Sequence, residues 1–551
     1  VTVKDWPDIV ERGVVEGFYG NNWSQTDRIR QFQFYGANKM NVYIYGPKDD
    51  PYHRGRWREN YPTAQAEKMR ELARVAKENK VKFVWAVHPG NDIKWNATDE
   101  QNVVNKLESM YALGIRSFAV FFDDISGEGT SGIKQAQLMN YVTDNFVRKH
   151  DDVDPLIICP TEYNRGWSGN TYHFELRDNM YEEVRIMWTG NSVVDMIEEN
   201  DMKWINDQIR RKAYIWLNYP VNDYCQSRLL MGKTYGNGLN INDMVSGFCS
   251  NPMEYAEASK LSLYSIADYT WNMAAYDSVS SWERALKVLM PTCHEAFRIF
   301  CENNVDIGYS VHGLRRDGES PNFDAASQES LSKNFAELVW AADNILADEV
   351  NSPEMLAEIR PWVESMRLLG LRGQMYINML KDLEQKDSVA FVGHARAQFQ
   401  LEQQQKAIIS RNYEGSIVKA KPLVSGEVIT PWLAGKINGL IDTYKEPFSY
   451  GHEYFPVQSI EDGEYIIKVN GEYLTNVNAN PDMTGDCPVF VAERDLINPQ
   501  RQQWVIEQNA QNGRYKIYNK QDGRYINELG AFWRRKKSTR IFRKVVFLAS
   551  P

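Results

Sequence analysis

Two adjacent carboxylates, Asp123 and Asp124, follow an apolar run at residues 116–122 and precede a glycine-containing turn. Neighbouring side chains within a strand point to opposite faces, so the two carboxylates can share a pocket only where the strand stops and the backbone turns. Glycine supplies that freedom. Two like charges this close do not both ionise readily, so one carboxyl keeps its proton while the other stays anionic. That division suits acid-assisted cleavage of a sugar–oxygen bond, whereas an isolated Asp-Asp pair is more often a solvated loop.

Eight short apolar runs alternate with longer polar stretches of helical pattern between residues 12 and 252. Apolar strands that alternate with helices indicate a parallel sheet covered on both faces. Eight such units in about 250 residues match a closed (β/α)8 TIM barrel. A doubly wound open sheet is disfavoured because no Gly-x-Gly-x-x-Gly follows the first run. The predicted strands are residues 13–18, 40–45, 82–88, 116–122, 156–160, 184–188, 213–217 and 245–249.

Polar or small side chains follow nearly every one of these predicted strands. In a (β/α)8 barrel the carboxyl ends of all the strands converge on one face, where active sites lie. We therefore expect these side chains to surround one pocket at the barrel mouth. They include Tyr19, Lys48, His88, Asp123, Asp124, Tyr163, Thr189, Asn218, Asp223 and Asn251.

The chain changes character after the predicted barrel, which we place at residues 1–276. From residue 277 to residue 450 the apolar residues recur with helical spacing, as in the stretch 328–346. Helical spacing of apolar residues over several consecutive segments predicts an α-helical bundle. We therefore expect a helical domain at residues 277–450, between the barrel and the end of the chain.

A third segment, residues 455–551, is expected to form a small all-β module. Residues 462–474 and 512–526 resemble each other, and each has the pattern of a strand, a tight Asx-Gly-type turn and a second strand. Gln502-Gln-Trp504 resembles the Gln-x-Trp signature of ricin-type β-trefoil lectin domains, although only about two of three expected repeats are visible. The module is therefore expected to be trefoil-like and incomplete, and a second sugar site in it is one expectation.

Composition limits the classes of partner. The 551-residue chain carries a net charge of −10, which argues against nucleic acid because phosphate binding needs a basic face. No apolar run is long enough to span a bilayer. The six cysteines are scattered without Cys-x-x-Cys spacing, so they indicate neither a zinc site nor a disulfide framework, and we expect no metal or cofactor. The basic stretch at residues 534–545 fits a surface tail, or an altered reading frame at the end of the coding region, better than a nucleic-acid arm.

Several long motifs identify a family that the chain resembles. They are Val14-Val-Glu-Gly-Phe-Tyr-Gly20, Asn41-Val-Tyr-Ile-Tyr-Gly-Pro-Lys-Asp-Asp-Pro-Tyr-His53, Phe118-Ala-Val-Phe-Phe-Asp-Asp-Ile125, Cys159-Pro-Thr-Glu-Tyr-Asn164 and Ser246-Gly-Phe-Cys-Ser-Asn-Pro-Met253. Together they resemble glycoside hydrolase family 84, the O-GlcNAcases and related bacterial hexosaminidases. The resemblance runs through the barrel, continues more loosely into the helical domain and does not reach the last hundred residues.

The resemblance implies retaining, substrate-assisted removal of β-linked N-acetylglucosamine from a glycan or glycoprotein. In such a reaction the 2-acetamido oxygen of the substrate attacks the anomeric carbon and forms an oxazoline, an exception to attack by a second carboxylate. The resemblance assigns Asp123 to the acetamido N–H and to the positive charge that develops on the ring. It assigns Asp124 to protonation of the leaving oxygen and then to activation of water. Tyr163 resembles the phenol that donates to the acetamido oxygen.

The same resemblance implies substrate contacts for nine further positions. From the residues alone, two of these assignments have alternatives. Lys48 could instead be an ion-pair partner of Asp49 or Asp50, and loop asparagines are usually turn formers rather than ligand contacts. Sugar hydroxyls are expected to meet the backbone of Gly17 and the side chains of Lys48, Asn218, Asp223 and Asn251. Walls of the pocket are expected from Trp216, Thr189, Cys159 and Tyr19.

Histidine 88 and two glutamates receive supporting roles. His88 ends a predicted strand, and the family gives it no acid or base function, so we expect it to donate a hydrogen bond to a catalytic neighbour. Glu16 and Glu162 flank key motifs, and each is expected either to orient a neighbour or to form a salt bridge at the barrel rim.

The sequence also departs from the family. In the bacterial relatives an α/β domain precedes the barrel, and residues 1–7 resemble only its trailing end, so the chain is expected to be a fragment or a mature product. A secreted or periplasmic location is expected.

Two other functions compete with hydrolysis by paired carboxylates. A non-catalytic glycan-binding protein is disfavoured because Asp123, Asp124 and Tyr163 are all present. A metal-dependent hydrolase is disfavoured because no clustered ligand spacing accompanies His88. Hyaluronidase-like activity within the same family remains an alternative.

Overall fold

The computed structural model of this chain describes residues 4–169, 171–305, 309–310, 313–314, 323–413, 416–445, 462–469, 472–476, 487–508, 515–521, 523, 525–526 and 531–533. The chain forms two compact units. The first comprises Val1–Leu371 and Gln403–Pro431, and the second comprises Arg372–Glu402 and Trp432–Pro551.

Eight parallel strands close into a barrel in the order in which they occur along the chain. The ring closes where β1 pairs with β8, with Gly13 opposite Cys249. Each strand overlaps the run predicted for it, so the (β/α)8 prediction is confirmed. The strands are β1 (Arg12–Glu16), β2 (Val42–Tyr45), β3 (Lys82–Val87), β4 (Ser117–Phe121), β5 (Ile157–Cys159), β6 (Arg185–Trp188), β7 (Ala213–Leu217) and β8 (Val245–Ser250).

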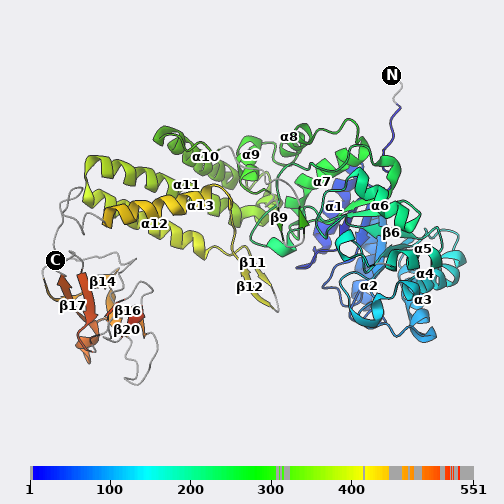
Figure 1. Cartoon of the computed structure of the whole chain (residues 1–551), viewed down its shortest axis with the longest axis horizontal. Helices are drawn as coiled ribbons and strands as arrows, with labels where there is room; N and C mark the ends of the chain where they lie inside the picture. Colours follow the sequence, from blue (N-terminus) through cyan, green and yellow to red (C-terminus); the bar gives the residue numbers. More distant parts are fainter. Residues whose placement is uncertain are drawn as a thin grey trace. The chain divides into compact units, whose positions relative to one another are not determined.

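Helices cover the outside of the barrel strands (Figure 1). They are α1 (Gln25–Ala37), α2 (Thr63–Glu78), α3 (Ala97–Tyr111), α4 (Gly132–Asn145), α5 (Tyr172–Asn179), α6 (Glu199–Ile209) and α7 (Ala256–Trp271). Short polar side chains start several of them. Ser24 and Asp27 form a capping box that begins α1, because the first backbone N–H groups of a helix need acceptors.

One of the eight predicted strand–helix units has no α-helix. Residues 218–244, all of them described, connect β7 to β8 through two 3-10 turns, η4 (Asp223–Cys225) and η5 (Asn242–Met244). The segment contains five Asn, three Gly and one Pro, residue types that favour turns over helix. The connection is therefore an extended loop, and it carries Asp223.

Apolar side chains fill the barrel interior, so it is a packed core rather than a channel. The strands are buried along most of their length because helices cover them outside and this core fills them inside. The interior cluster consists of Val15, Val42, Ile44, Val84, Ala86, Ala119, Phe121, Ile157, Cys159, Tyr163, Met187, Tyr214, Trp216 and Cys249. Tyr163 and Trp216 belong to both the core and the barrel mouth.

A helical region follows the barrel, as predicted. Its helices are α8 (Ser278–Leu289), α9 (His294–Glu302), α10 (Gln328–Ala347), α11 (Pro353–Gln385), α12 (Ser388–Ala407) and α13 (Ile429–Lys445). Within the first compact unit it anchors the β7–β8 loop. The Trp362 indole N–H donates to the Ser227 carbonyl at 2.9 Å, and Arg228 pairs with Glu427 at 2.7 Å. In the described part of the chain, none of the helices is both long and apolar enough to cross a membrane.

The second compact unit contains the predicted all-β module. Antiparallel pairs β14–β15 and β18–β19 confirm the two predicted hairpins. Gln502 and Trp504 are buried, and the Trp504 indole N–H donates to the Leu474 carbonyl at 2.9 Å, so they hold strands together. The strands are β13 (Gly463–Ile466), β14 (Lys468–Val469), β15 (Glu472–Asn476), β16 (Cys487–Ala492), β17 (Gln503–Gln508), β18 (Tyr515–Asn519), β19 (Tyr525–Ile526) and β20 (Ala531–Trp533).

The boundaries at 276 and 450 and the trefoil likeness stay predictions. The two compact units divide the helical region between them instead of treating it as one domain. Four further strands form two short hairpins, β9 (Tyr309–Ser310) with β10 (Gly313–Leu314) and β11 (Arg411–Tyr413) with β12 (Ser416–Ala420). The predicted basic tail at residues 534–545 lies outside the described residues.

Candidate active site

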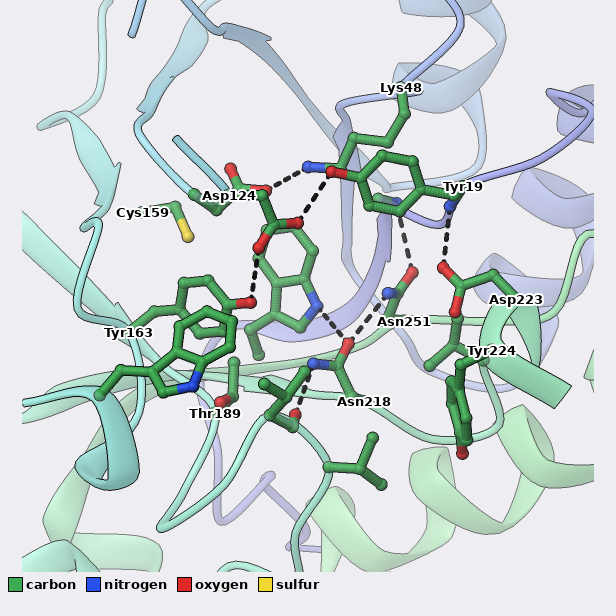
Figure 2. A pocket seen from close by; sticks show the side chains of 17 residues that line it. Tyr19, Lys48, Asp124, Cys159, Tyr163, Thr189, Asn218, Asp223, Tyr224 and Asn251 are labelled. Atoms are coloured by element: carbon green, nitrogen blue, oxygen red, sulfur yellow. Dashed lines mark hydrogen bonds and ion pairs between the residues drawn. The ribbon is translucent and has the colours of Figure 1, made fainter. Parts of the chain in front are cut away.

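A cavity of about 310 Å³ opens at the carboxyl ends of the barrel strands. This volume lies at the small end of the ~300–1,000 Å³ typical of ligand sites and suits a single sugar ring. The twelve residues that the sequence analysis assigned to catalysis or substrate binding line it, together with five others (Figure 2). His88, which was also expected around the pocket, is not among the lining residues. The lining residues are Gly17, Tyr19, Lys48, Asp123, Asp124, Cys159, Tyr163, Trp167, Thr189, Val193, Val194, Trp216, Asn218, Val221, Asp223, Tyr224 and Asn251.

The two carboxylates reach the same cavity because the backbone turns at the second of them. Asp123 lies two residues after the end of β4, and Asp124 has a φ of 54°, in the left-handed region. A non-glycine residue there is uncommon and costs of the order of 1–3 kcal/mol, and such residues concentrate at functional sites. The sequence assigned the turn to the glycines that follow, whereas Asp124 itself makes it. The left-handed turn brings neighbouring side chains, which a strand would send to opposite faces, into one cavity.

Asp123 is buried and held in its anionic form. Its carboxylate forms an ion pair with the Lys48 ammonium, and both side chains are almost fully shielded from solvent. Burial alone would raise the pKa of Asp123, but the positive charge of Lys48, with a smaller contribution from Arg54, holds it well below its usual range. A carboxylate in this setting stays negatively charged at all ordinary pH values.

His88 contacts Asp123 and helps to hold it in position. Its Nε2–H donates to the backbone carbonyl of Asp123 at 2.8 Å, and it lies 3.5 Å from the carboxylate Oδ1. Burial lowers the pKa of His88 to about 4, so the ring is neutral at pH 7. His88 therefore orients the end of β4 as a hydrogen-bond donor, the role predicted for it.

Asp124 differs from its neighbour in exposure and in partners. It is exposed, and its two oxygens accept hydrogen bonds from the hydroxyls of Tyr19 and Tyr163, each at 2.8 Å. Figure 2 shows the carboxylate between these two phenols. Burial, with the nearby Asp124 charge, raises the pKa of Tyr163, so its hydroxyl stays protonated and able to donate. Asp124 is thus placed to exchange a proton with a group that enters the cavity.

A hydrogen-bonded network of amides forms another part of the cavity wall. The Asn218 Oδ1 accepts from the Trp216 indole and from the Asn251 amide, both at 2.9 Å. The Asn251 Oδ1 accepts from the Gly17 N–H at 3.3 Å. These bonds fix the amide orientations and the indole that walls the cavity. Gly17 is required there, because a Cβ at this position would lie 2.3 Å from the Trp216 ring.

Asp223 lies on the β7–β8 loop. It accepts a hydrogen bond from the Tyr19 N–H at 2.9 Å, which ties this loop to the segment after β1. A carboxylate at this position can accept hydrogen bonds from the hydroxyls of a sugar.

Cys159 and Thr189 are both buried in the cavity wall. Burial raises the pKa of the Cys159 thiol far above its usual value, so it is a wall residue and not a nucleophile. The Thr189 hydroxyl donates to the Ser192 carbonyl at 2.9 Å and shapes the loop that carries Val193.

Five lining residues escaped the sequence analysis: Trp167, Val193, Val194, Val221 and Tyr224. Trp167 packs on Tyr163 with ring centroids 5.0 Å apart and lies four positions after it, and Tyr224 adjoins Asp223, so proximity to predicted residues could have found both. The valines bear no reactive group and gave no signal. The Val193 carbonyl accepts a hydrogen bond from the Asn218 side-chain amide at 2.7 Å, and all three valines add apolar surface to the cavity.

Two open alternatives from the sequence are now decided. Lys48 does form an ion pair, but its partner is Asp123 and not Asp49 or Asp50. The Asp50 carboxylate instead accepts hydrogen bonds from Tyr45 and Tyr61. Glu16 forms a buried salt bridge with Arg28 at 2.7 Å, one of the two alternatives expected for it.

The chain is similar to known glycoside hydrolases. Residues 12–302 match the β-N-acetylglucosaminidase family, and residues 314–414 match the bacterial GH84 post-catalytic domain. The protein O-GlcNAcase of Rattus norvegicus is 31% identical over 271 residues, which are 47% of this chain and 29% of that protein. The chain therefore spans less than a third of the length of this curated relative.

Solved structures are similar over most of the chain. The structure of CpGH84B is 33% identical, with a TM-score of 0.69, and the match covers 79% of this chain and 78% of that chain. The structure of CpGH84D is 28% identical, with a TM-score of 0.70, and the match covers 80% and 76% of the two chains.

Proposed function

Because the chain belongs to glycoside hydrolase family 84, we propose that it is a retaining exo-β-N-acetylglucosaminidase that releases β-linked N-acetylglucosamine from glycoconjugates. The 2-acetamido group of the substrate acts as the nucleophile. Asp123 and Asp124 have different roles, which follow from their different surroundings.

In the first step the acetamido oxygen attacks the anomeric carbon and the glycosidic bond breaks. Asp123, kept anionic by Lys48, accepts the acetamido N–H and balances the positive charge that spreads over the ring and the forming oxazoline. The Tyr163 hydroxyl holds the acetamido group in position. Asp124 transfers its proton to the departing oxygen.

In the second step water opens the oxazoline. Asp124, now deprotonated, takes a proton from the water as it attacks the anomeric carbon from the side that the leaving group vacated. The oxazoline C–O bond breaks, its electrons return to the acetamido group, and the configuration is retained. Asp123 remains anionic throughout and keeps its hydrogen bond to the N–H, so the oxazoline carries the N–H proton and a positive charge until its C–O bond breaks.

The observation that carries this proposal is the asymmetry of the adjacent carboxylates. Asp123 is buried against a cation, whereas Asp124 is exposed and bound by two phenols. An enzymic nucleophile would have to approach the anomeric carbon directly, and the buried Asp123 is already bound to Lys48. The acetamido oxygen of the substrate has no such restriction.

Progressive fluorination of the acetamido methyl group tests the proposal. The purified protein should hydrolyse 4-nitrophenyl N-acetyl-β-glucosaminide, and kcat/KM should fall steeply through the mono-, di- and trifluoroacetyl analogues, because fluorine withdraws electrons from the attacking oxygen. Rates that do not depend on fluorination would indicate an enzymic nucleophile. Absence of turnover of the parent glycoside would overturn the proposed activity.

A further inference from the structure

Three arginines lie close together in the segment after β2, and only one of them is without a carboxylate partner among the described residues. Arg56 forms a bidentate pair with Glu59. Arg58 binds Asp92 and Asp99. Arg54 makes a side-chain hydrogen bond only to the Tyr19 hydroxyl, at 3.5 Å, and its Nε has no hydrogen-bond partner in the described structure.

Arg54 lies at the rim of the cavity, next to the residue that holds Asp124. Its guanidinium carbon is 5.6 Å from the centre of the Tyr19 ring, and the Tyr19 hydroxyl is 2.8 Å from the Asp124 carboxylate. Tyr19 is 41% exposed, which places it at the mouth. Arg54 does not line the cavity itself, so it lies beside the sugar subsite and one hydroxyl group away from Asp124.

Arg54 lies where the leaving group of the substrate would lie in the proposed reaction. The inference therefore rests on the proposed function. The glycosidic oxygen must come within hydrogen-bond distance of Asp124 to receive its proton. The first atoms of the aglycone then extend past Tyr19 toward the opening. A guanidinium presents several N–H donors in a planar fork that matches a carboxylate, and those of Arg54 are not committed to a protein carboxylate.

We propose that Arg54 selects N-acetyl-β-glucosaminides whose aglycone carries a carboxylate close to the glycosidic oxygen. The guanidinium binds this carboxylate. The effect of its charge on Asp123 is common to all substrates and therefore does not alter the choice between them. Arg56, two positions away and already paired, contributes no such preference.

Two aryl glycosides of nearly equal shape test the assignment: 3-carboxyphenyl and 3-carbamoylphenyl N-acetyl-β-glucosaminide. The selectivity is the ratio of their kcat/KM values at low ionic strength. Because both values come from one preparation, the ratio does not depend on the fraction of folded protein. A role of Arg54 limited to holding Tyr19 would change both rates equally and leave the ratio unchanged.

Arg54→Met should lower the selectivity for the carboxylate by about fivefold relative to the unmodified protein, the size expected for a partly exposed ion pair. Arg54→Lys should keep most of it, and the matched control Arg56→Met should keep all of it. Added salt should lower the selectivity of the unmodified protein, because partly exposed charges are screened.

Unchanged selectivity in Arg54→Met would overturn the assignment. An equal loss of selectivity in Arg56→Met would also overturn it, since the preference would then come from the summed positive charge of the segment and not from Arg54. In either case hydrolysis of both glycosides would leave the proposed function standing. If neither glycoside is hydrolysed, the proposed function is overturned, and this assignment with it.

Discussion

The two ends of the barrel both carry clustered charges, but the charges are arranged differently. At the amino ends of the strands, Glu11 pairs with Lys82 and with Arg185, and Lys82 also pairs with Asp154 at 2.8 Å. At the carboxyl ends, Asp123 pairs with Lys48, whereas Asp124 contacts hydroxyls and not cations among the described residues.

The difference separates structural charges from reactive ones. Opposite charges that satisfy one another stabilise the fold and have no proton to give. At the mouth Asp123 is held as an anion by Lys48, whereas its neighbour Asp124 is bound only by hydroxyl groups among the described residues. Substitutions at the mouth should therefore affect catalysis, and substitutions at the opposite end should affect stability.

The largest effect is expected for Asp123→Asn. The substitution removes the negative charge that balances the developing positive charge, so kcat/KM should fall about 10²–10³-fold whatever the leaving group. Steady-state kinetics on activated and unactivated aryl glycosides measure this loss. The matched control is Asp154→Asn at the other end of the barrel, which should change kcat/KM little. Similar losses in both variants would erase the distinction between the two ends.

Lys48→Met should change the pH dependence. The substitution removes the cation that lowers the pKa of Asp123 while the burial that raises it remains. The pKa of Asp123 should therefore rise, and its anionic form should disappear at a higher pH as the solution is acidified. We expect the acid limb of the kcat/KM–pH profile to move up by at least about one pH unit.

Lys82→Met is the control for this profile. Lys82 is also an ion-paired lysine, with Glu11 and Asp154 as its partners, but it lies at the opposite end of the barrel from the mouth. Its profile should coincide with that of the unmodified protein. An acid limb that stays in place in Lys48→Met would show that Lys48 does not hold Asp123 ionised.

Gly17→Ala should have a smaller effect on kinetics. The new methyl group would meet the Trp216 ring at 2.3 Å, and the displaced indole would disturb its hydrogen bond to Asn218. A displacement of this kind should lower kcat/KM about tenfold or more, since misplacement by about 1 Å can cost up to about 10²-fold. Gly55→Ala, where nothing lies within 4 Å, should be neutral. Equal kinetics of the two variants would remove the steric role of Gly17.

The smallest effect on activity is expected for Glu11→Gln. The loss of its charge leaves Lys82 and Arg185 with one carboxylate fewer, so the free energy of unfolding should fall by about 1–3 kcal/mol. Chemical denaturation measures it, and kcat should be unchanged for the folded protein. A loss of kcat without a loss of stability would contradict the structural role of this end.

Much of the fold and of the cavity could be predicted from the sequence. Apolar runs such as residues 213–217 gave the strands, because strands buried on both faces must be continuously apolar. The polar residues at the ends of these runs could be placed together because the carboxyl ends of parallel strands meet at one face. The missing helix between β7 and β8 was the main departure, and the Asn and Gly content of the connecting segment explains it.

The electrostatic details could not be predicted, because they depend on contacts between distant segments. Lys48 and Asp123 are 75 positions apart, and only the barrel geometry makes them partners. The left-handed conformation of Asp124 is imposed by its surroundings, since an aspartate does not adopt it by preference. Val193 and Val194 enter the cavity through the shape of a loop that sequence patterns do not specify.

The most direct test of the division between the two carboxylates is the leaving-group dependence of Asp124→Asn. The parameter kcat/KM reports the steps up to loss of the aglycone, so it isolates protonation of the leaving oxygen. With 2,4-dinitrophenolate, which needs no proton to depart, kcat/KM should stay close to that of the unmodified protein. With 4-methoxyphenolate it should fall by about 10² or more. Equal losses on both substrates would contradict the assignment of Asp124 as the acid.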